Sequence, residues 1–339
     1  MSAPLTKPGG RLDDVDRMKG MVILLVVLGH IVAREPPAGH AWWDTLRAAI
    51  YAFHMPAFLY LGGLVMAHTG GLRVGPGEAY RVYLDRRAVR LLIPFFGLGL
   101  LVIAGKLMLA PFLHVDNAPE SLGMALLGLV WETSRSPSLT VWYVFVAFAY
   151  AAALPPLVRL SGGSIAPVIA LALLLFALPV PQIAYLDRVA GYAVFFAAGL
   201  VAGIHLPAWL TVVDRHGPVF LLVFLASLTF VLLPGIPADL QLLVAGLLSM
   251  PALHAMARHP AVSRQRVWAW LGRYAFAIYL LNTITIGLTK AVLFELLGTW
   301  DGGKFAVFAP ILIAAGLLGP VVMKAAVFGR IPVLDRLTN

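Results

Sequence analysis

Long apolar runs alternate with short polar segments along almost the whole chain. Each run approaches the roughly 20 apolar residues that a helix needs to cross the hydrocarbon core of a bilayer. The pattern therefore predicts an all-α, polytopic integral membrane protein with about ten transmembrane helices. These predicted spans centre on residues 16–33, 46–66, 91–110, 139–158, 164–180, 188–206, 218–234, 239–257, 268–289 and 305–326.

One further apolar run, residues 121–130, is short, and we interpret it as an outer-surface or re-entrant helix. If this run crossed the membrane, the arginines at 258–266 would lie on the opposite side from those at 86–90. With ten spans, most of the 25 Lys and Arg residues share one side with both ends of the chain. Because basic loops tend to stay in the cytoplasm, both termini are predicted to be cytoplasmic.

The composition agrees with a membrane protein and narrows its chemistry. Hydrophobic residues make up 60% of the chain and charged residues 12%, which is more apolar surface than a soluble core can bury. The formal net charge is +9, but the basic residues lie between apolar runs without the interleaved aromatics of a nucleic-acid surface. We read them as orientation signals and expect no nucleic-acid partner.

The chain contains no cysteine, which excludes disulfides, a thiol nucleophile and a thiolate metal site. No metal site is predicted from the other residues either. Since no repeat or long polar linker divides the sequence, we expect residues 1–339 to form a single integral membrane domain.

The first span has ionisable groups at both ends. Asp16 and Lys19 precede its apolar run and His30 closes it. At 100° and 1.5 Å per residue, the side chains of Lys19 and His30 project from one helix face, about 16 Å apart. A histidine inside a span is costly and usually functional. The simpler interpretation is a headgroup lysine at one end and a capping histidine at the other.

The second span contains His54, two residues before Pro56, and a Gly62-Gly63 pair follows. Pro56 removes one backbone donor and is predicted to bend the helix, which exposes carbonyl groups to a cavity. His54 should lie at a depth close to that of His30. Alternatively, the segment is a kinked helix with packing glycines and a hydrogen-bonded core histidine.

A dense arginine cluster, Arg81, Arg86, Arg87 and Arg90, immediately precedes the third span. Arg87 and Arg90 are three residues apart and so share a helix face, where guanidinium groups can grip phosphate oxygens bidentately. The alternative is a positive-inside anchor, which explains one or two arginines but gives no reason for so many.

Other residues within or beside the spans can also carry chemistry. Trp142 and Tyr143 open the fourth span, either as part of an interfacial aromatic belt or as a carbohydrate-stacking pair. Asn282, inside the ninth span, needs a hydrogen-bond partner on another helix or on a substrate hydroxyl. Snorkelling is the simplest account of Lys106 and Lys290.

Taken in order, these motifs resemble those of the family-3 membrane acyltransferases, and within them the fucose 4-O-acetylase-like branch. The resemblance covers the whole chain and rests on Asp16-x-x-Lys19-Gly20, Val26-Val27-Leu28-Gly29-His30, Phe53-His54-Met55-Pro56, Arg87-x-x-Arg90 before Leu91-Leu92-Ile93-Pro94, Trp142-Tyr143, and Gly272-Arg273 followed by Tyr279-Leu280-Leu281. It implies transfer of an acetyl or other acyl group from cytoplasmic acetyl-CoA to a hydroxyl of a carbohydrate or lipid-linked acceptor at the outer side. The expected location is a bacterial inner membrane.

The resemblance also implies roles for individual residues. His30 and Lys19 become the catalytic candidates, while Arg87 and Arg90 would bind the CoA phosphates, with Arg86 beside them. His30 would act as a general base on the acceptor hydroxyl or would itself accept the acetyl group. The candidate substrate contacts are Asp16, His54, Trp142, Tyr143 and Asn282.

Three positions depart from the family pattern. Lys19 stands where many members have arginine, Gly62 where serine is frequent, and Asn282 where histidine is frequent. Lys19 keeps the positive charge, whereas Asn282 removes a possible second base. Two other classes therefore stay open: a transporter with a polar translocation path, and a non-catalytic scaffold that binds an envelope glycan. No matched pair of interrupted halves favours the transporter.

Overall fold

The computed structural model describes residues 11–32, 37–112, 115, 117–330 and 335, and its regular structure there is entirely helical. Eight helices of the described part are long and apolar enough to cross a membrane, with α2 and α3 counted as one. The predicted all-α, polytopic fold is confirmed. The α-helices are α1 (Asp13–His30), α2 (Trp42–Tyr51), α3 (His54–His68), α4 (Glu78–Leu109), α5 (Leu122–Val130), α6 (Trp142–Leu160), α7 (Ala166–Ala177), α8 (Leu186–Ile204), α9 (Leu206–Val231), α10 (Ala238–Arg258), α11 (Pro260–Ser263), α12 (Arg266–Leu297) and α13 (Phe305–Ala326).

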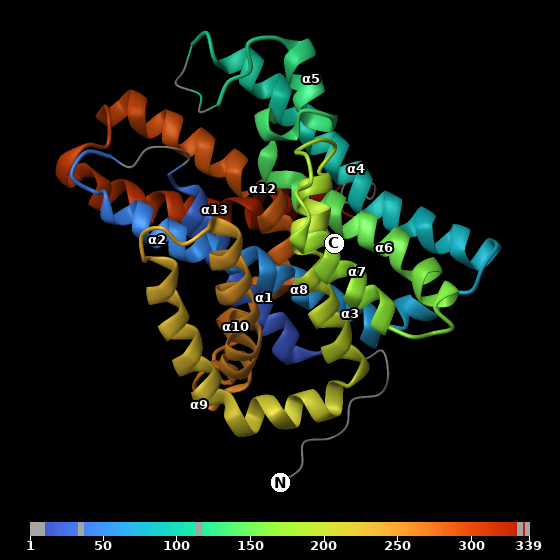
Figure 1. The fold of residues 1–339 in the computed structure, drawn as a ribbon. Coiled ribbons are helices and arrows are strands. Elements are labelled where there is room, and N and C mark those ends of the chain that lie inside the picture. The colour runs from blue at the N-terminus through green and yellow to red at the C-terminus, as the bar shows by residue number, and fades with distance from the viewer. Residues whose placement is uncertain (1–10, 33–36, 113–114, 116, 331–334, 336–339) are drawn as a thin grey trace.

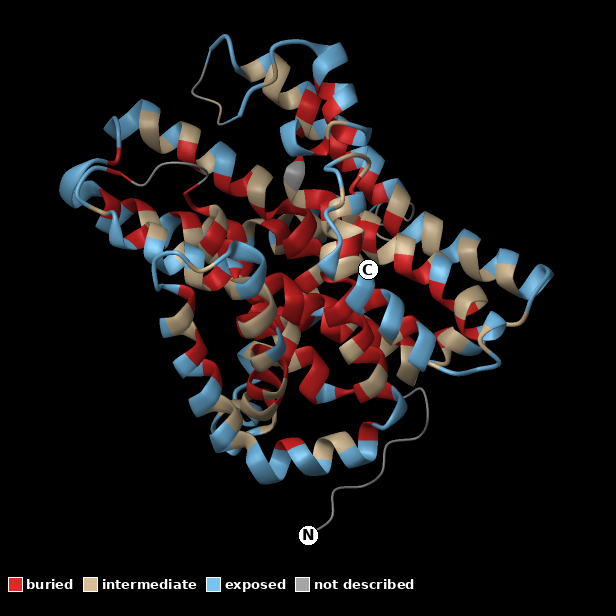
Figure 2. Cartoon of the chain, in the orientation of Figure 1, coloured by how far each residue is buried: buried red, intermediate tan, exposed pale blue. Residues whose placement is uncertain are grey.

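Helix α1 lies in the middle of the bundle (Figure 1), where it packs against α12, α3, α10 and α13. It is not one of the eight apolar helices because its first turn holds Asp13, Asp14 and Asp16. Most residues of its central turns are nevertheless buried, with Val22 and Val27 both at 0% exposure. Figure 2 shows the buried residues concentrated around this central helix. The element that carries Lys19 and His30 is thus the core of the fold.

Helices α1 and α12 run parallel and touch through their backbones. A Cβ added to Gly20 would lie 2.0 Å from the carbonyl oxygen of Trp268, and one added to Gly272 would lie 1.8 Å from that of Asp16. Only glycine permits so close an approach. Ten residues beyond this contact on each helix, His30 meets Asn282. The glycine contact therefore sets the separation at which these two polar side chains face one another.

The second predicted span is correct in extent but wrong in shape. The helix breaks at residues 52–53, so α2 ends at Tyr51 and α3 starts at His54. Pro56 consequently lies in the first turn of α3, where a backbone N–H has no intrahelical acceptor and proline is tolerated. The bend precedes the proline. The Gly62-Gly63 pair does pack as glycines should, since a Cβ on Gly63 would lie 2.1 Å from the carbonyl oxygen of Phe196 in α8.

Helix α7 has 12 residues, fewer than a straight span needs, yet the neighbouring helices show which way the chain travels. Trp142 is the first residue of α6 and Arg188 lies in the first turn of α8. The guanidinium carbon of Arg188 lies 5.4 Å from the ring centroid of Trp142. Since α6 and α8 therefore begin at the same end of the bundle and run the same way, residues 166–185 must carry the chain back to that end. This agrees with the predicted span at 164–180.

Helices α4 and α9 extend well beyond the predicted spans 91–110 and 218–234. Helix α4 has 32 residues and is about 48 Å long, so it includes the whole arginine cluster. In α9, Figure 1 shows a first part that lies across the foot of the bundle before the helix turns upward. Pro218 lies inside this helix and explains a bend of this kind. Hydropathy located the apolar parts of these helices and missed their polar extensions.

Residues 122–130 form helix α5, whose nine residues span about 13 Å and are too few to cross a bilayer. The helix packs against α4 and next to the start of α8, where the Tyr185 hydroxyl donates to the carbonyl oxygen of Leu129 at 3.1 Å. Nearby, Lys106 reaches out of α4 and its Nζ donates to the carbonyl oxygen of Pro137 at 2.8 Å. Lys106 thus has a protein partner at the end of its helix. Snorkelling is wrong for Lys290, which is buried with its Nζ 4.3 Å from the Trp300 ring centroid.

We expect the two ends of the bundle to face opposite sides of the membrane, with the loop of residues 131–138 outside. The test is labelling of single cysteines in intact cells with a membrane-impermeant thiol reagent, for which the cysteine-free chain is a clean background. Ser134→Cys, at an exposed loop position, should react. Ser263→Cys, exposed between α10 and α12, should react only after the cells are opened. Labelling of Ser263→Cys in sealed cells would reverse the predicted orientation.

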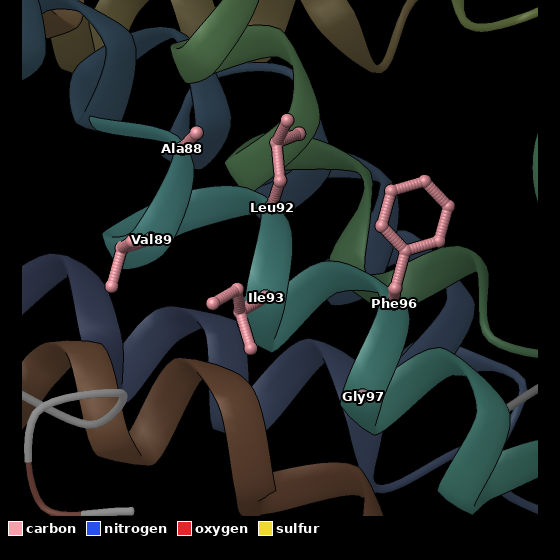
Figure 3. Close-up of a pocket in the computed structure, with 6 residues that line it drawn as sticks. All are labelled: Ala88, Val89, Leu92, Ile93, Phe96 and Gly97. Carbon is pink, nitrogen blue, oxygen red and sulfur yellow. The ribbon is translucent and has the colours of Figure 1, made fainter. Parts of the chain in front are cut away.

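The outward helix faces are apolar, as a lipid-facing surface requires. On α4 they include Ile93, Phe96 and Leu101, each more than a third exposed. Figure 3 shows a shallow hollow on this face, lined by Ala88, Val89, Leu92, Ile93, Phe96 and Gly97. No polar side chain lines it among the described residues. We regard it as part of the lipid-facing surface and look elsewhere for the chemistry.

Candidate active site

A second, larger hollow of about 710 Å³ lies between α1, α3, α4, α6 and α12 and is strongly basic. Its volume is typical of small-molecule sites. Six cationic side chains and a single carboxylate line it, together with several aromatic rings. We call it the cationic cavity; its charged residues are Arg11, Asp16, Lys19, Arg87, Arg90, Arg273 and Lys324.

The predicted arginine pair points into the cationic cavity from α4. Arg87 and Arg90 share one helix face, as their spacing predicts, and each stacks on a ring: Arg87 lies 5.2 Å from the Tyr83 centroid and Arg90 lies 5.8 Å from the Phe276 centroid. Arg86 is exposed and does not line the cavity, because one residue along a helix turns the side chain by 100°. The geometry thus separates Arg86 from the pair.

Lys19 and Asp16 enter the same cavity from α1. The Nζ of Lys19 lies 3.5 Å from Oδ1 of Asp16, and the Asp16 carboxylate also pairs with Arg11. The carboxylate is buried while Lys19 remains half-buried. Asp16 therefore holds cations at the mouth of the cavity, and its single negative charge leaves the cavity net positive.

Two tyrosines line the part of the cavity that is nearest to His30. The Tyr279 hydroxyl donates to the carbonyl oxygen of Thr140 and accepts the backbone N–H of Tyr143 at 3.2 Å. The two rings pack edge to face with centroids 5.3 Å apart. Asn282 lies three residues beyond Tyr279 on α12, so the partner of His30 is one helical turn further along.

His30 is held by Asn282 in a single tautomer. The Asn282 Nδ2 donates to the carbonyl oxygens of Ile278 at 2.7 Å and Tyr279 at 2.9 Å, which directs its Oδ1 toward His30. His30 Nδ1 lies 2.8 Å from that oxygen. Because Oδ1 only accepts, Nδ1 carries a proton, and in the neutral imidazole the lone pair is on Nε2. Nε2 is then a basic nitrogen, and Asn282 fixes its direction.

His54 lies next to this pair, as its predicted depth requires. Its Nδ1–H donates to the carbonyl oxygen of Ile50 at 2.8 Å, across the break between α2 and α3, and its side chain is buried. Its ring lies 5.0 Å from that of Tyr51, whose hydroxyl bonds to Gly29, the residue before His30. His54 does not line the cationic cavity, and its hydrogen bond to a freed carbonyl agrees with a core position beside the site.

Trp142 and Tyr143 are adjacent in sequence but lie in different environments. Tyr143 lines the cationic cavity. Trp142 is 8% exposed and packs on Tyr192, with ring centroids 4.8 Å apart, and on Arg188. An interfacial belt would leave the tryptophan at the lipid surface, so that expectation is wrong for Trp142. The structure gives this tryptophan no opening toward a substrate.

Sequence reasoning missed some of the cavity cations. Arg273 follows the contact glycine of α12, and Lys324 comes from the last turn of α13. Each is an ordinary basic residue at the end of an apolar run, which is the usual pattern of a topology signal. Only the packing of α12 and α13 against α1 turns both side chains toward Arg87 and Arg90.

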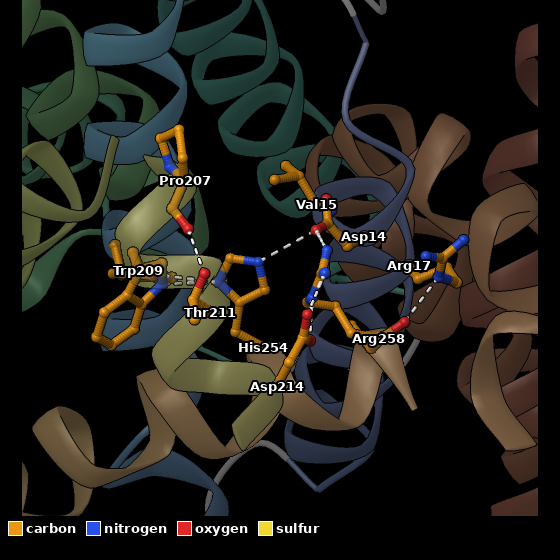
Figure 4. Close-up of polar contacts among 11 residues, drawn as sticks. Asp14, Val15, Arg17, Pro207, Trp209, Thr211, Asp214, His254 and Arg258 are labelled. Carbon is orange, nitrogen blue, oxygen red and sulfur yellow. Dashed lines mark hydrogen bonds and ion pairs between the residues drawn. The ribbon is translucent and has the colours of Figure 1, made fainter. Parts of the chain in front are cut away.

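A partly buried polar network at the foot of the bundle was also missed (Figure 4). Arg258 forms two 2.6 Å contacts with the Asp214 carboxylate and a 2.7 Å contact with Asp14. His254 Nδ1 accepts from Trp209 Nε1 at 3.2 Å, which places the His254 proton on Nε2, 3.5 Å from Asp14. The network ties α1 to α9 and α10, just before the turn of α1 that carries Asp16 and Lys19.

Within the described residues, no group of three His, Asp or Glu side chains gathers to hold a metal ion. The polar groups that do gather are cations facing a cavity and one oriented imidazole beyond its aromatic end. Such an arrangement suits an anionic ligand that extends toward a base.

Comparison with known proteins places the chain in a family. The nodulation protein NolL of Sinorhizobium fredii (strain NBRC 101917 / NGR234) is 32% identical over 138 residues, which are 40% of this chain and 33% of NolL. The match thus spans one third of that relative's length. No solved structure matches the chain. The model of the acyltransferase 3 family, described as an acyltransferase domain, matches residues 12–325. The chain therefore belongs to the acyltransferase 3 family.

Proposed function

We propose that this protein is a membrane O-acyltransferase that moves an acetyl group from acetyl-CoA to a hydroxyl of a carbohydrate or lipid-linked acceptor. Acetyl-CoA binds from the cytoplasm and the acceptor binds at the outer side of a bacterial inner membrane. The observation that carries the proposal is the cationic cavity, which leads from Arg87 and Arg90 to the turn of α12 below the His30–Asn282 pair.

The cationic cavity suits the donor because CoA carries several phosphate charges. Arg87 and Arg90 offer paired N–H donors, and Arg273, Lys19 and Lys324 add positive charge around them. Arginine is a favoured phosphate ligand because its planar guanidinium binds two oxygens at once. The aromatic lining, with Phe276 and Tyr274 among its rings, suits an adenine base. The thioester end then extends past Tyr143 and Tyr279 toward His30.

His30 performs the proton transfer in this proposal. Nε2 removes the proton of the acceptor hydroxyl as its oxygen attacks the thioester carbonyl carbon. The new C–O bond forms, the C–S bond breaks, and the proton passes from His30 to the departing CoA sulfur. Asn282 keeps Nδ1–H occupied throughout, so that the lone pair stays on Nε2. The same nitrogen can instead carry the acetyl group covalently in a two-step reaction.

We expect Arg87→Ala and Arg90→Ala each to weaken CoA binding by about tenfold to a hundredfold, the range for losing a charge-assisted phosphate contact. The measurement is direct binding of CoA to the purified protein in detergent. Arg81→Ala is the matched control, since Arg81 is on the same helix but exposed and paired with Glu78. Unchanged CoA affinity in both single variants and in the double variant would reduce these arginines to topology anchors.

A further inference from the structure

Tyr51, the last residue of α2, stands beside His30 in an unusual orientation. Its hydroxyl points inward and donates to the carbonyl oxygen of Gly29 at 2.9 Å, while the residue as a whole is 41% exposed. A tyrosine that anchors a protein at a membrane interface does the reverse, with its ring in the apolar layer and its hydroxyl in water. The orientation of Tyr51 therefore requires another explanation.

Local packing locks the Tyr51 ring in place. Helix α1 ends at His30, so the carbonyl of Gly29 lacks an intrahelical donor and the Tyr51 hydroxyl supplies one. A Cβ on Gly29 would lie 2.5 Å from Cε1 of Tyr51, so the ring needs a glycine at that position. The same Cβ would lie 3.4 Å from both Cδ1 and Cζ, so Gly29 meets the ring at its edge. One face of the ring lies 5.0 Å from the His54 imidazole, centroid to centroid.

The position of the ring relative to His30 matches that of an acceptor contact. Tyr51 contacts both Gly29, the residue before His30, and His54, so a partly exposed aromatic side chain is fixed close to the residue whose Nε2 would take the acceptor proton. Tyr51 is not part of the cationic cavity, which Arg87, Arg90 and Tyr143 line. The donor and this ring thus approach His30 from different directions. A preorganised ring binds at low entropic cost because it is already ordered.

We propose that Tyr51 forms the acceptor-binding platform, on which a pyranose ring stacks with one hydroxyl directed at His30. This rests on the proposed function and makes it more specific, since it assigns the acceptor a sugar ring whose C–H face packs on Tyr51. Aromatic rings bind sugars through their apolar C–H faces, in the same way that they pack against other apolar groups. The same side chain has a second role, because the hydrogen bond from its hydroxyl to the Gly29 carbonyl holds the end of α1 in place.

The test measures acetyl transfer by the full-length protein in liposomes, with acetyl-CoA and a panel of methyl hexosides and methyl deoxyhexosides as probes. A thiol-reactive dye reports released CoA, since the protein has no cysteine of its own. Tyr51→Leu should raise the KM for the glycoside by about tenfold, which corresponds to the upper range for one aromatic contact. The KM for acetyl-CoA should stay the same. Tyr51→Trp should keep the glycoside KM close to that of the parent.

Two further variants separate stacking from structure. Tyr51→Phe keeps the ring and removes the bond to Gly29, so it should lower kcat more than it raises the glycoside KM. Trp42→Leu is the matched control, because Trp42 is 54% exposed at the far end of the same helix and should leave both KM values unchanged. If Tyr51→Leu has the parent's glycoside KM, or Trp42→Leu raises it equally, the platform is wrong.

The outcome also distinguishes this proposal from the general function. If the parent releases CoA no faster than the His30→Ala variant, both the acyltransferase function and the platform are overturned. CoA release that depends on His30, but with no acetyl transfer to any glycoside of the panel, would overturn the platform alone and leave acyl transfer to another acceptor standing.

Discussion

His30→Ala is expected to lower the rate of acetyl transfer by about 10²- to 10⁴-fold, the contribution of a positioned general base. The affinity for CoA should remain that of the parent, because His30 does not line the cationic cavity. The folded yield should also hold, since alanine removes one hydrogen bond and leaves Asn282 with its two carbonyl partners in α12. The measurements are CoA release, acetyl transfer and CoA binding on one preparation.

Asn282→Leu is the companion variant for this prediction. The imidazole stays but Nδ1–H loses its acceptor, so the Nε2 lone pair is no longer assured and its direction is no longer fixed. We expect an intermediate loss of kcat, with Asn282→Asp closer to the parent because a carboxylate oxygen also accepts from Nδ1–H. A His30→Ala protein with full transfer activity would rule out the enzymatic role of this histidine.

The second large effect is expected from Gly272→Ala, which should prevent correct packing of α1 against α12. The added Cβ would lie 1.8 Å from the carbonyl oxygen of Asp16 and 2.6 Å from its carbon. Both are backbone atoms, so no side-chain rotation relieves the clash and the helices must separate. Overpacking of this kind costs about 3 kcal/mol or more, enough to lower the yield of monodisperse protein and its unfolding temperature in detergent.

Gly287→Ala is the matched control on the same helix. Among the described residues, no atom outside the helix lies within 4 Å of a Cβ at Gly287, and alanine has the higher helix propensity. It should therefore unfold at or slightly above the parent's temperature. If Gly272→Ala purified in good yield and unfolded at that same temperature, the close contact between the two helices would be wrong.

The type and order of the long helices could be predicted from the sequence because each apolar run is near the length that a bilayer demands, although eight described helices, and not ten, are long and apolar enough to cross. The ends of the helices could not. Residues 78–90 of α4 and 206–217 of α9 are helical but polar enough to lie outside an apolar run. Hydropathy measures contact with hydrocarbon, whereas a helix continues as far as its backbone hydrogen bonds do.

The site could be predicted in part. Arg87 and Arg90 were placed on one face by spacing alone, and both line the cavity. The link between His30 and Asn282 could not be predicted, because 252 residues separate them and only tertiary packing brings them together. Asn282 was expected to need a partner; the partner is the histidine itself. Tyr51 carried no motif at all, and its orientation depends on the glycine that precedes His30.

The shared register of α1 and α12 restricts how this chain can change in length. From the backbone contact at Gly20 and Gly272 to the His30–Asn282 pair, each helix advances by ten residues. Deleting one residue between Gly20 and His30 would rotate the imidazole by 100° and shift it by 1.5 Å, away from the amide that orients it. A matching deletion between Gly272 and Asn282 would bring both side chains back to the same height along the helices. It would also rotate both of them away from the face where α1 and α12 meet. Substitutions can therefore accumulate in these two segments, whereas insertions and deletions cannot.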